Sequence, residues 1–119
     1  QVVMKATDSG PYAEPIYEPA VERSLNIAIL DTLREEITEA GTTFSVAFLP
    51  GVKNTLVDEE RRRLLRDYAA DHGLRFSDLT DTIHAMGESA FIERNWHYNA
   101  KGHEAVAEQL VVLLESEFE

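Results

Sequence analysis

The segment "TFSVAFLP", Thr43 to Pro50, decides the predicted fold class. It is rich in β-branched and aromatic residues and carries little charge, and Pro50 ends the run. Such a run is typical of a strand inside a sheet that is covered on both faces. We therefore predict a buried strand over these residues.

Helical patterns lie on both sides of this strand. Before it, apolar residues recur at three- or four-residue spacing from Val21 to Ala40, and Gly41 follows as the expected C-terminal cap. After it, "VDEERRRLLRDYAADHG" carries acids in its first turn and ends at Gly73. The inward stripe of this second helix is predicted to consist of Leu64, Leu65, Tyr68 and Ala69.

A second strand and two further helices complete the pattern. "LRFSDL", Leu74 to Leu79, predicts a short strand. Thr80 is expected to cap a brief helix that runs through His84, and Gly87 to begin a loop. The final helix is predicted from about Ala100 to the end of the chain.

Alternation of helices and strands with short connections is the signature of an α/β domain with a parallel sheet. Val2 to Met4 is a candidate third strand, and Thr7 to Pro19 is predicted to be an extended loop, so that residues 1–19 form a lead-in segment. Because so few strands make a thin sheet, we expect residues 1–119 to be either a single α/β domain or the C-terminal portion of a longer one. An uncovered sheet edge then predicts self-association into a homo-oligomer.

Composition limits the classes of partner. The chain has 119 residues and a formal charge of −11, which repels nucleic acid and anionic membrane surfaces. No apolar run approaches the ~20 residues that span a bilayer, so membrane insertion is not expected. The absence of cysteine excludes disulfides, thiol nucleophiles and thiolate metal sites. Cellular location cannot be inferred from these features.

The segment "HYNAKGHEAVAEQL", His97 to Leu110, holds the candidate site. Asn99 is predicted to cap the final helix, and Gly102 in its first turn indicates close approach of another backbone. His97 precedes the cap in a loop, where the positive end of the helix disfavours a charged imidazole, as a general base requires. The alternative is a structural loop histidine with its hydrogen bonds satisfied. Trp96 is predicted to fill the core rather than to line a pocket.

This order of elements, with "H-x-N-x-x-G-H-x-x-V-A" before the last helix, resembles the C-terminal half of the SGNH (GDSL-type) hydrolases from roughly Val21 to Leu114. The resemblance implies a flavodoxin-like three-layer α/β/α fold with a parallel sheet, which this chain contains only in part. It also implies hydrolysis or transfer of acyl esters, with a serine nucleophile and His97 as its base. The implied substrate is a small-molecule or carbohydrate acyl ester, and no cofactor is implied.

The chain departs from the family pattern at the other catalytic positions. No Gly-Asp-Ser block is evident, and Ser9 is predicted to be a loop residue too close in sequence to His97 to act as the nucleophile. Asn54 is predicted to be a turn or capping residue. Asn95 stands where the family usually carries the triad aspartate, and its amide can still accept a hydrogen bond from the imidazole.

The remaining polar residues are assigned structural roles. Glu93 is expected to be a solvated surface carboxylate, and Asp78 to cap or turn the end of a strand. His97 and His103 lack a third nearby ligand, so no metal site is predicted. The sequence thus favours the C-terminal part of an ester hydrolase that supplies His97 and Asn95. The alternative is an α/β interaction module that has lost the serine and the aspartate of the triad.

Overall fold

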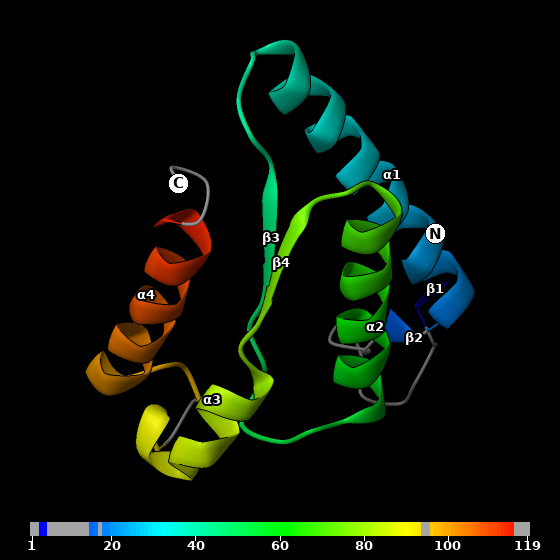
Figure 1. The fold of residues 1–119 in the computed structure, drawn as a ribbon. Helices are drawn as coiled ribbons and strands as arrows, with labels where there is room; N and C mark the ends of the chain where they lie inside the picture. Colours follow the sequence, from blue (N-terminus) through cyan, green and yellow to red (C-terminus); the bar gives the residue numbers. More distant parts are fainter. Residues whose placement is uncertain (1–2, 5–14, 17, 94–95, 116–119) are drawn as a thin grey trace. The chain divides into compact units, whose positions relative to one another are not determined.

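A computed structural model describes residues 3–4, 15–16, 18–93 and 96–115. The chain divides into two compact units, residues 1–43 and residues 44–119. The mixed α/β class is confirmed, since a parallel pair of strands alternates with helices in the second unit (Figure 1). None of the helices in the described residues combines the length and the apolar character needed to cross a bilayer.

The first unit contains helix α1, Pro19–Glu39. Proline suits its first turn because the amide that proline lacks has no partner inside a helix at that position. Gly41 ends it with φ of 72°, while the amide of Thr42 donates to the carbonyl of Ile37 at 3.1 Å. This is a Schellman motif, and it confirms Gly41 as the C-terminal signal.

The candidate third strand does not join the parallel sheet. Strand β1, Val3–Met4, pairs antiparallel with β2, Pro15–Ile16, in a separate two-stranded sheet. The expectation for Val2 to Met4 was therefore wrong within the described residues, because Val3 lies opposite Ile16 and Met4 lies opposite Pro15 in this separate sheet. The predicted loop also contains a strand at Pro15–Ile16, and most of its other residues lie outside the described part.

The second unit is built on one β-α-β crossover. Strands β3, Ser45–Phe48, and β4, Arg75–Asp78, are parallel and joined by helix α2, Leu56–Asp71. Val46 lies opposite Phe76, and the amide of Leu79 continues the pairing by donating to the carbonyl of Phe48 at 3.0 Å. Both predicted strands are confirmed, with shorter bounds than their apolar runs.

The two faces of β3 are covered to different extents. Val46 and Phe48 are buried, whereas Ser45 and Ala47 are half-buried and every residue of β4 is half-buried. The prediction of a strand buried on both faces was therefore too strong. In the described residues each strand pairs with only one neighbour, so both are edge strands. Figure 1 shows α2 and α4 on opposite sides of the strands.

Local sequence explains the ends of α2. The hydroxyl of Thr55 accepts a hydrogen bond from the amide of Asp58 at 3.1 Å, which satisfies one of the unpaired amides of the first turn. Gly73 ends the helix at φ of 64°, as its position predicts. Of the predicted inward stripe, Leu64, Tyr68 and Ala69 are buried, and Leu65 is half-buried.

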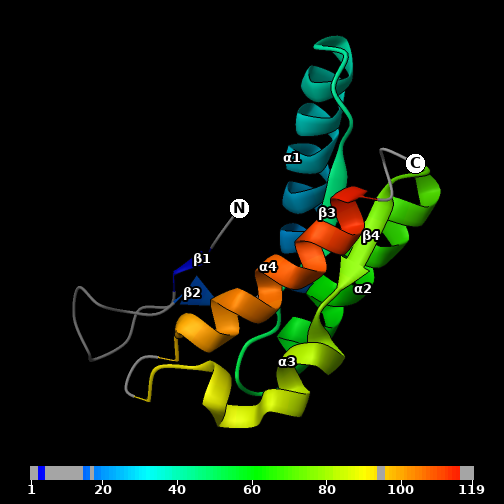
Figure 2. The same ribbon diagram turned by 60° about the vertical axis from the view of Figure 1, so that its left-hand side comes forward.

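Three further helical segments follow β4: α3, Thr80–Met86; η2, a short 3₁₀ helix at Gly87–Ala90; and α4, Ala100–Glu115. Figures 1 and 2 both show α3 and the start of α4 beyond the carboxyl ends of β3 and β4. The core cluster of the unit lies among these elements and consists of Leu79, Ile83, Ala90, Phe91 and Val106. Ala47 packs against this cluster, so strand alternation directs Val46 and Phe48 to the other face, where α2 lies.

Candidate functional site

The loop that carries His97 is closed by a short antiparallel contact. Phe91 and Tyr98 form an isolated β-bridge across it. The amide of Ile92 donates to the carbonyl of His97 at 2.7 Å, and the amide of Trp96 donates to the carbonyl of Ile92 at 3.0 Å. The side chain of His97 is exposed. Asn95, the proposed partner of the imidazole, lies outside the described residues.

Trp96 does not fill the core, contrary to the prediction. Its side chain is 41% exposed and its backbone has φ of 55°, in the left-handed region that bulky residues rarely adopt. Phe91, which is buried, and Tyr98, which is half-buried, take the inward positions of the bridge instead. The indole therefore lies at the surface next to His97.

Tyr98 ties this loop to the end of strand β3. Its hydroxyl donates a hydrogen bond to the carbonyl of Pro50, two residues beyond the last residue of β3. The tyrosine ring lies 5.0 Å, centroid to centroid, from Phe91 and 6.0 Å, edge-on, from His103. Partial burial raises the pKa of Tyr98, so the hydroxyl remains a donor at neutral pH. The loop that carries His97 is consequently tied, through the side chain of Tyr98, to the segment that follows β3.

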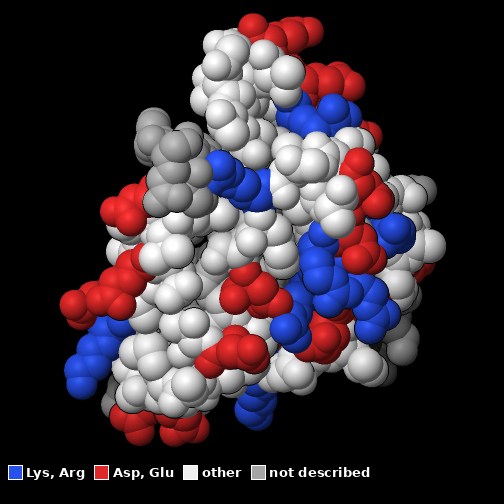
Figure 3. Space-filling view, viewed as in Figure 1, with Lys and Arg blue, Asp and Glu red and all other residues white. Residues whose placement is uncertain are grey.

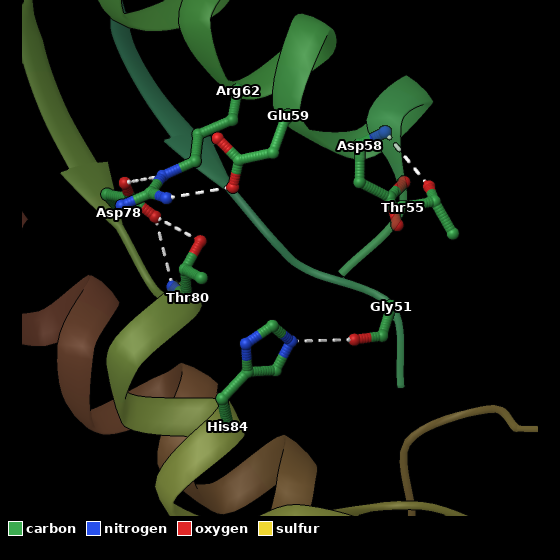
Figure 4. A network of polar contacts seen from close by, with 8 residues as sticks. All are labelled: Gly51, Thr55, Asp58, Glu59, Arg62, Asp78, Thr80 and His84. Atoms are coloured by element: carbon green, nitrogen blue, oxygen red, sulfur yellow. Dashed lines mark hydrogen bonds and ion pairs between the residues drawn. The ribbon is translucent and has the colours of Figure 1, made fainter. Parts of the chain in front are cut away.

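A second side chain holds the next carbonyl of the same segment. The Nε2 atom of His84, on α3, lies 3.1 Å from the carbonyl oxygen of Gly51, and Figure 4 shows the imidazole pointing at that group. Consecutive carbonyls, Pro50 and Gly51, are thus contacted from two different parts of the chain. The segment after β3 is therefore linked both to α3 and to the loop that carries His97.

The start of α4 confirms two predictions. The Oδ1 atom of Asn99 accepts from the amide of Gly102 at 2.9 Å, while its Nδ2 atom donates to the carbonyls of Ser89 at 2.7 Å and Phe91 at 3.3 Å. A Cβ atom added to Gly102 would lie 2.3 Å from the carbonyl oxygen of Ala90. Asn99 is the cap and Gly102 permits a close backbone approach, as the sequence indicates.

Asp78 has a structural role, as predicted, whereas Thr80 does not cap α3. The N-cap position of this helix is Leu79, and Asp78 accepts from the amide of Thr80, the first residue of the helix. The Oδ1 atom of Asp78 accepts from the amide of Thr80 at 3.0 Å and from the hydroxyl of Thr80 at 2.6 Å, and its Oδ2 atom pairs with Arg62 (Figure 4). Partial burial raises the pKa of this carboxyl, but the hydrogen bonds from Thr80 and Arg62 outweigh that effect and the net pKa is lowered. The hydrogen bond to Asp78 in turn raises the pKa of Arg62.

Charged side chains on α2 form ion pairs with acidic neighbours. Arg62 also contacts Glu59 at 3.1 Å, and Arg66 lies 3.6 Å from Asp67. On the face drawn in Figure 3, basic side chains alternate with acidic ones in the region of this helix. A mixed surface of this kind lacks the single-sign patch that binds phosphate backbones.

Other predicted residues are placed as follows. Asn54 is exposed and directly precedes Thr55, which is the residue that caps α2. Glu93 is exposed, as expected, and Ser9 lies outside the described residues. In the part of the chain that the structure describes, no three His, Asp or Glu side chains gather to hold a metal ion.

Sequence reasoning missed Tyr98 and His84. Both reach carbonyls that lie more than thirty residues away in sequence. Periodicity and motif spacing carry no signal for such contacts, although the position of Tyr98 between His97 and Asn99 in the motif was visible.

No family model, no curated protein and no solved structure matches the chain.

Proposed function

We propose that this chain is the base-bearing C-terminal part of an SGNH-type serine hydrolase, an esterase or acyltransferase that acts on small-molecule or carbohydrate acyl esters. The observation that carries the proposal is the hydrogen bond from Tyr98 to Pro50, which holds the loop of His97 beside the carboxyl end of β3. In open α/β sheets, ligands bind in the crevice outside the carboxyl ends of the strands. We propose that the exposed side chain of His97, one residue before Tyr98, acts on an ester bound in that crevice.

The proposed chemistry needs a nucleophilic serine from outside the described residues. His97 removes the proton from its hydroxyl as the oxygen attacks the ester carbonyl, and the same imidazole then returns that proton to the departing alcohol. Water attacks the acyl-serine in hydrolysis, and an acceptor alcohol does so in transfer. Asn95 would orient the imidazole through its amide oxygen, in the position where the family has a carboxylate.

The proposed fold is the flavodoxin-like three-layer sandwich of that family. Helices α2 and α4 on opposite sides of β3 and β4 support it, because they form the two outer layers of such a sandwich (Figure 1). The additional strands of the sheet would come from residues outside the second unit.

The test uses the native gene product that contains these 119 residues, assayed with p-nitrophenyl acetate. His97→Ala should lower kcat by a factor of about 10² to 10⁴, the usual contribution of a general base. His72→Ala is the matched control, because His72 is also exposed but is the C-cap residue of α2 and is not part of the loop of His97. Asn95→Asp should preserve or raise turnover.

Labelling with a fluorophosphonate, followed by mass spectrometry, should identify the serine in the wild type. Turnover that survives His97→Ala would refute the assignment of the base. A native protein that neither hydrolyses esters nor reacts with the fluorophosphonate would instead support the alternative, a non-catalytic interaction module.

A further inference from the structure

We infer that Tyr98 is a positioning residue, whose hydroxyl fixes the loop of His97 through the carbonyl of Pro50; this inference rests on the proposed function. Tyr98 directly follows His97 in the chain, and its hydroxyl contacts the segment after β3. The proposed base is therefore one peptide bond away from a residue whose side chain is anchored just beyond the end of β3. A shift of the anchor moves the imidazole with it.

The anchor itself is held from several directions. Proline fixes the backbone φ angle of residue 50, and His84 contacts the next carbonyl, that of Gly51 (Figure 4). Two residues upstream of Pro50, the carbonyl of Phe48 accepts from the amide of Leu79 at 3.0 Å. Pro50 is thus bracketed by contacts to the segment that begins α3, which makes it a firm support for a side chain from elsewhere.

The tyrosine ring and its hydroxyl have separable roles. The ring packs against Phe91 at 5.0 Å and His103 at 6.0 Å, and these contacts join the loop to the core and to α4. The hydroxyl adds the bond across to Pro50, which sets the position of the loop relative to the strand. Tyr98→Phe removes that bond and leaves the ring contacts in place.

Placement of a base matters because proton transfer requires hydrogen-bond distance between the base and the group it deprotonates. A displacement of about 1 Å can lower the rate by a factor of about 10². The loop is also joined by backbone bonds, so loss of the Tyr98 bond should loosen it without unfolding it. We expect kcat to fall by roughly ten- to a hundredfold in Tyr98→Phe, with KM changed less than about twofold.

The experiment compares Tyr98→Phe with Tyr68→Phe in the native gene product. Tyr68 is a buried tyrosine on α2, so its variant also loses a hydroxyl from a packed ring but does not touch the loop. Amide hydrogen exchange gives a second readout that does not depend on catalysis. Exchange at Ile92 and Trp96, whose amides close the loop, should accelerate by about tenfold in Tyr98→Phe and remain unchanged in Tyr68→Phe.

The outcomes separate this inference from the proposed function. Unchanged exchange at both amides would overturn the positioning role, whatever happens to turnover. Faster exchange with full turnover would also overturn it, provided that His97→Ala is inactive. If His97→Ala is fully active, the proposed base is wrong, and the exchange data alone decide whether Tyr98 anchors the loop.

Discussion

Gly102→Ala is expected to destabilise the chain, although alanine is the better helix former. Gly102 is buried in the first turn of α4, against the backbone of Ala90, the last residue of η2. A Cβ atom at this position would lie 2.3 Å from the oxygen and 3.2 Å from the carbon of the Ala90 carbonyl, and 3.1 Å from Cβ of Tyr98. The closest of these atoms belongs to the backbone, so the clash cannot be relieved by rotating a side chain.

The magnitude follows from opposing effects. Replacing glycine by alanine inside a helix gains about 1 kcal/mol. Against this, overpacking costs about 1 to 3 kcal/mol, and the upper end applies where the neighbour is backbone. The Ala90 carbonyl also accepts from the amide of Asn99 at 2.9 Å, and disturbing that bond costs about 1 kcal/mol more. We expect a net loss of about 2 to 3 kcal/mol in the free energy of unfolding.

Urea unfolding followed by far-UV circular dichroism measures this loss, and the fluorescence of Trp96, the only tryptophan, reports on the adjacent loop. Ala107→Gly is the matched control, because Ala107 is exposed on the same helix and reports propensity alone. Ala107→Gly should lower the free energy of unfolding by about 1 kcal/mol. If Gly102→Ala gains as much stability as Ala107→Gly loses, the close approach of α4 to Ala90 does not exist and this reasoning is refuted.

Two further predictions concern polar contacts. Asn99→Ala should lower the free energy of unfolding by about 2 kcal/mol, because it removes the cap on the amide of Gly102 and the hydrogen bonds to two carbonyls. Thermal melts compare it with Asn99→Ser, which keeps a capping oxygen and should lose less stability. An equal loss in both variants would show that the cap is unimportant. The pKa of Asp78 is lowered from its usual 3.8 by folding, so its stabilising effect is complete above that value and is lost as the pH falls through the lower folded-state pKa. Asp78→Asn should therefore be less stable than the wild type at pH 7, with the difference narrowing below about pH 4, and urea titrations that give a pH-independent difference would contradict this assignment.

The sequence by itself determined the order and type of the α-helices and the two strands of the second unit, whereas the 3₁₀ helix η2 lies where a loop was predicted. Gly41 and Gly73 end their helices because they adopt a left-handed backbone at little cost, and Asn99 begins α4 because its side chain accepts from the amide of Gly102. These are local effects, set by the residues within one helical turn. The composition of the apolar run from Thr43 to Pro50 likewise predicts the strand β3 from local sequence alone.

Contacts between distant segments were decided only by the tertiary structure. Strand β1 pairs within the first unit rather than with β3, Trp96 lies at the surface, and Asp78 accepts from the amide of Thr80, the residue that was expected to cap α3. In each case several partners satisfy the same local pattern, and packing selects among them. The hydrogen bond from Tyr98 to Pro50 belongs to this class, because it depends on how α4 and the loop before it meet the end of β3, which no periodicity in the sequence encodes.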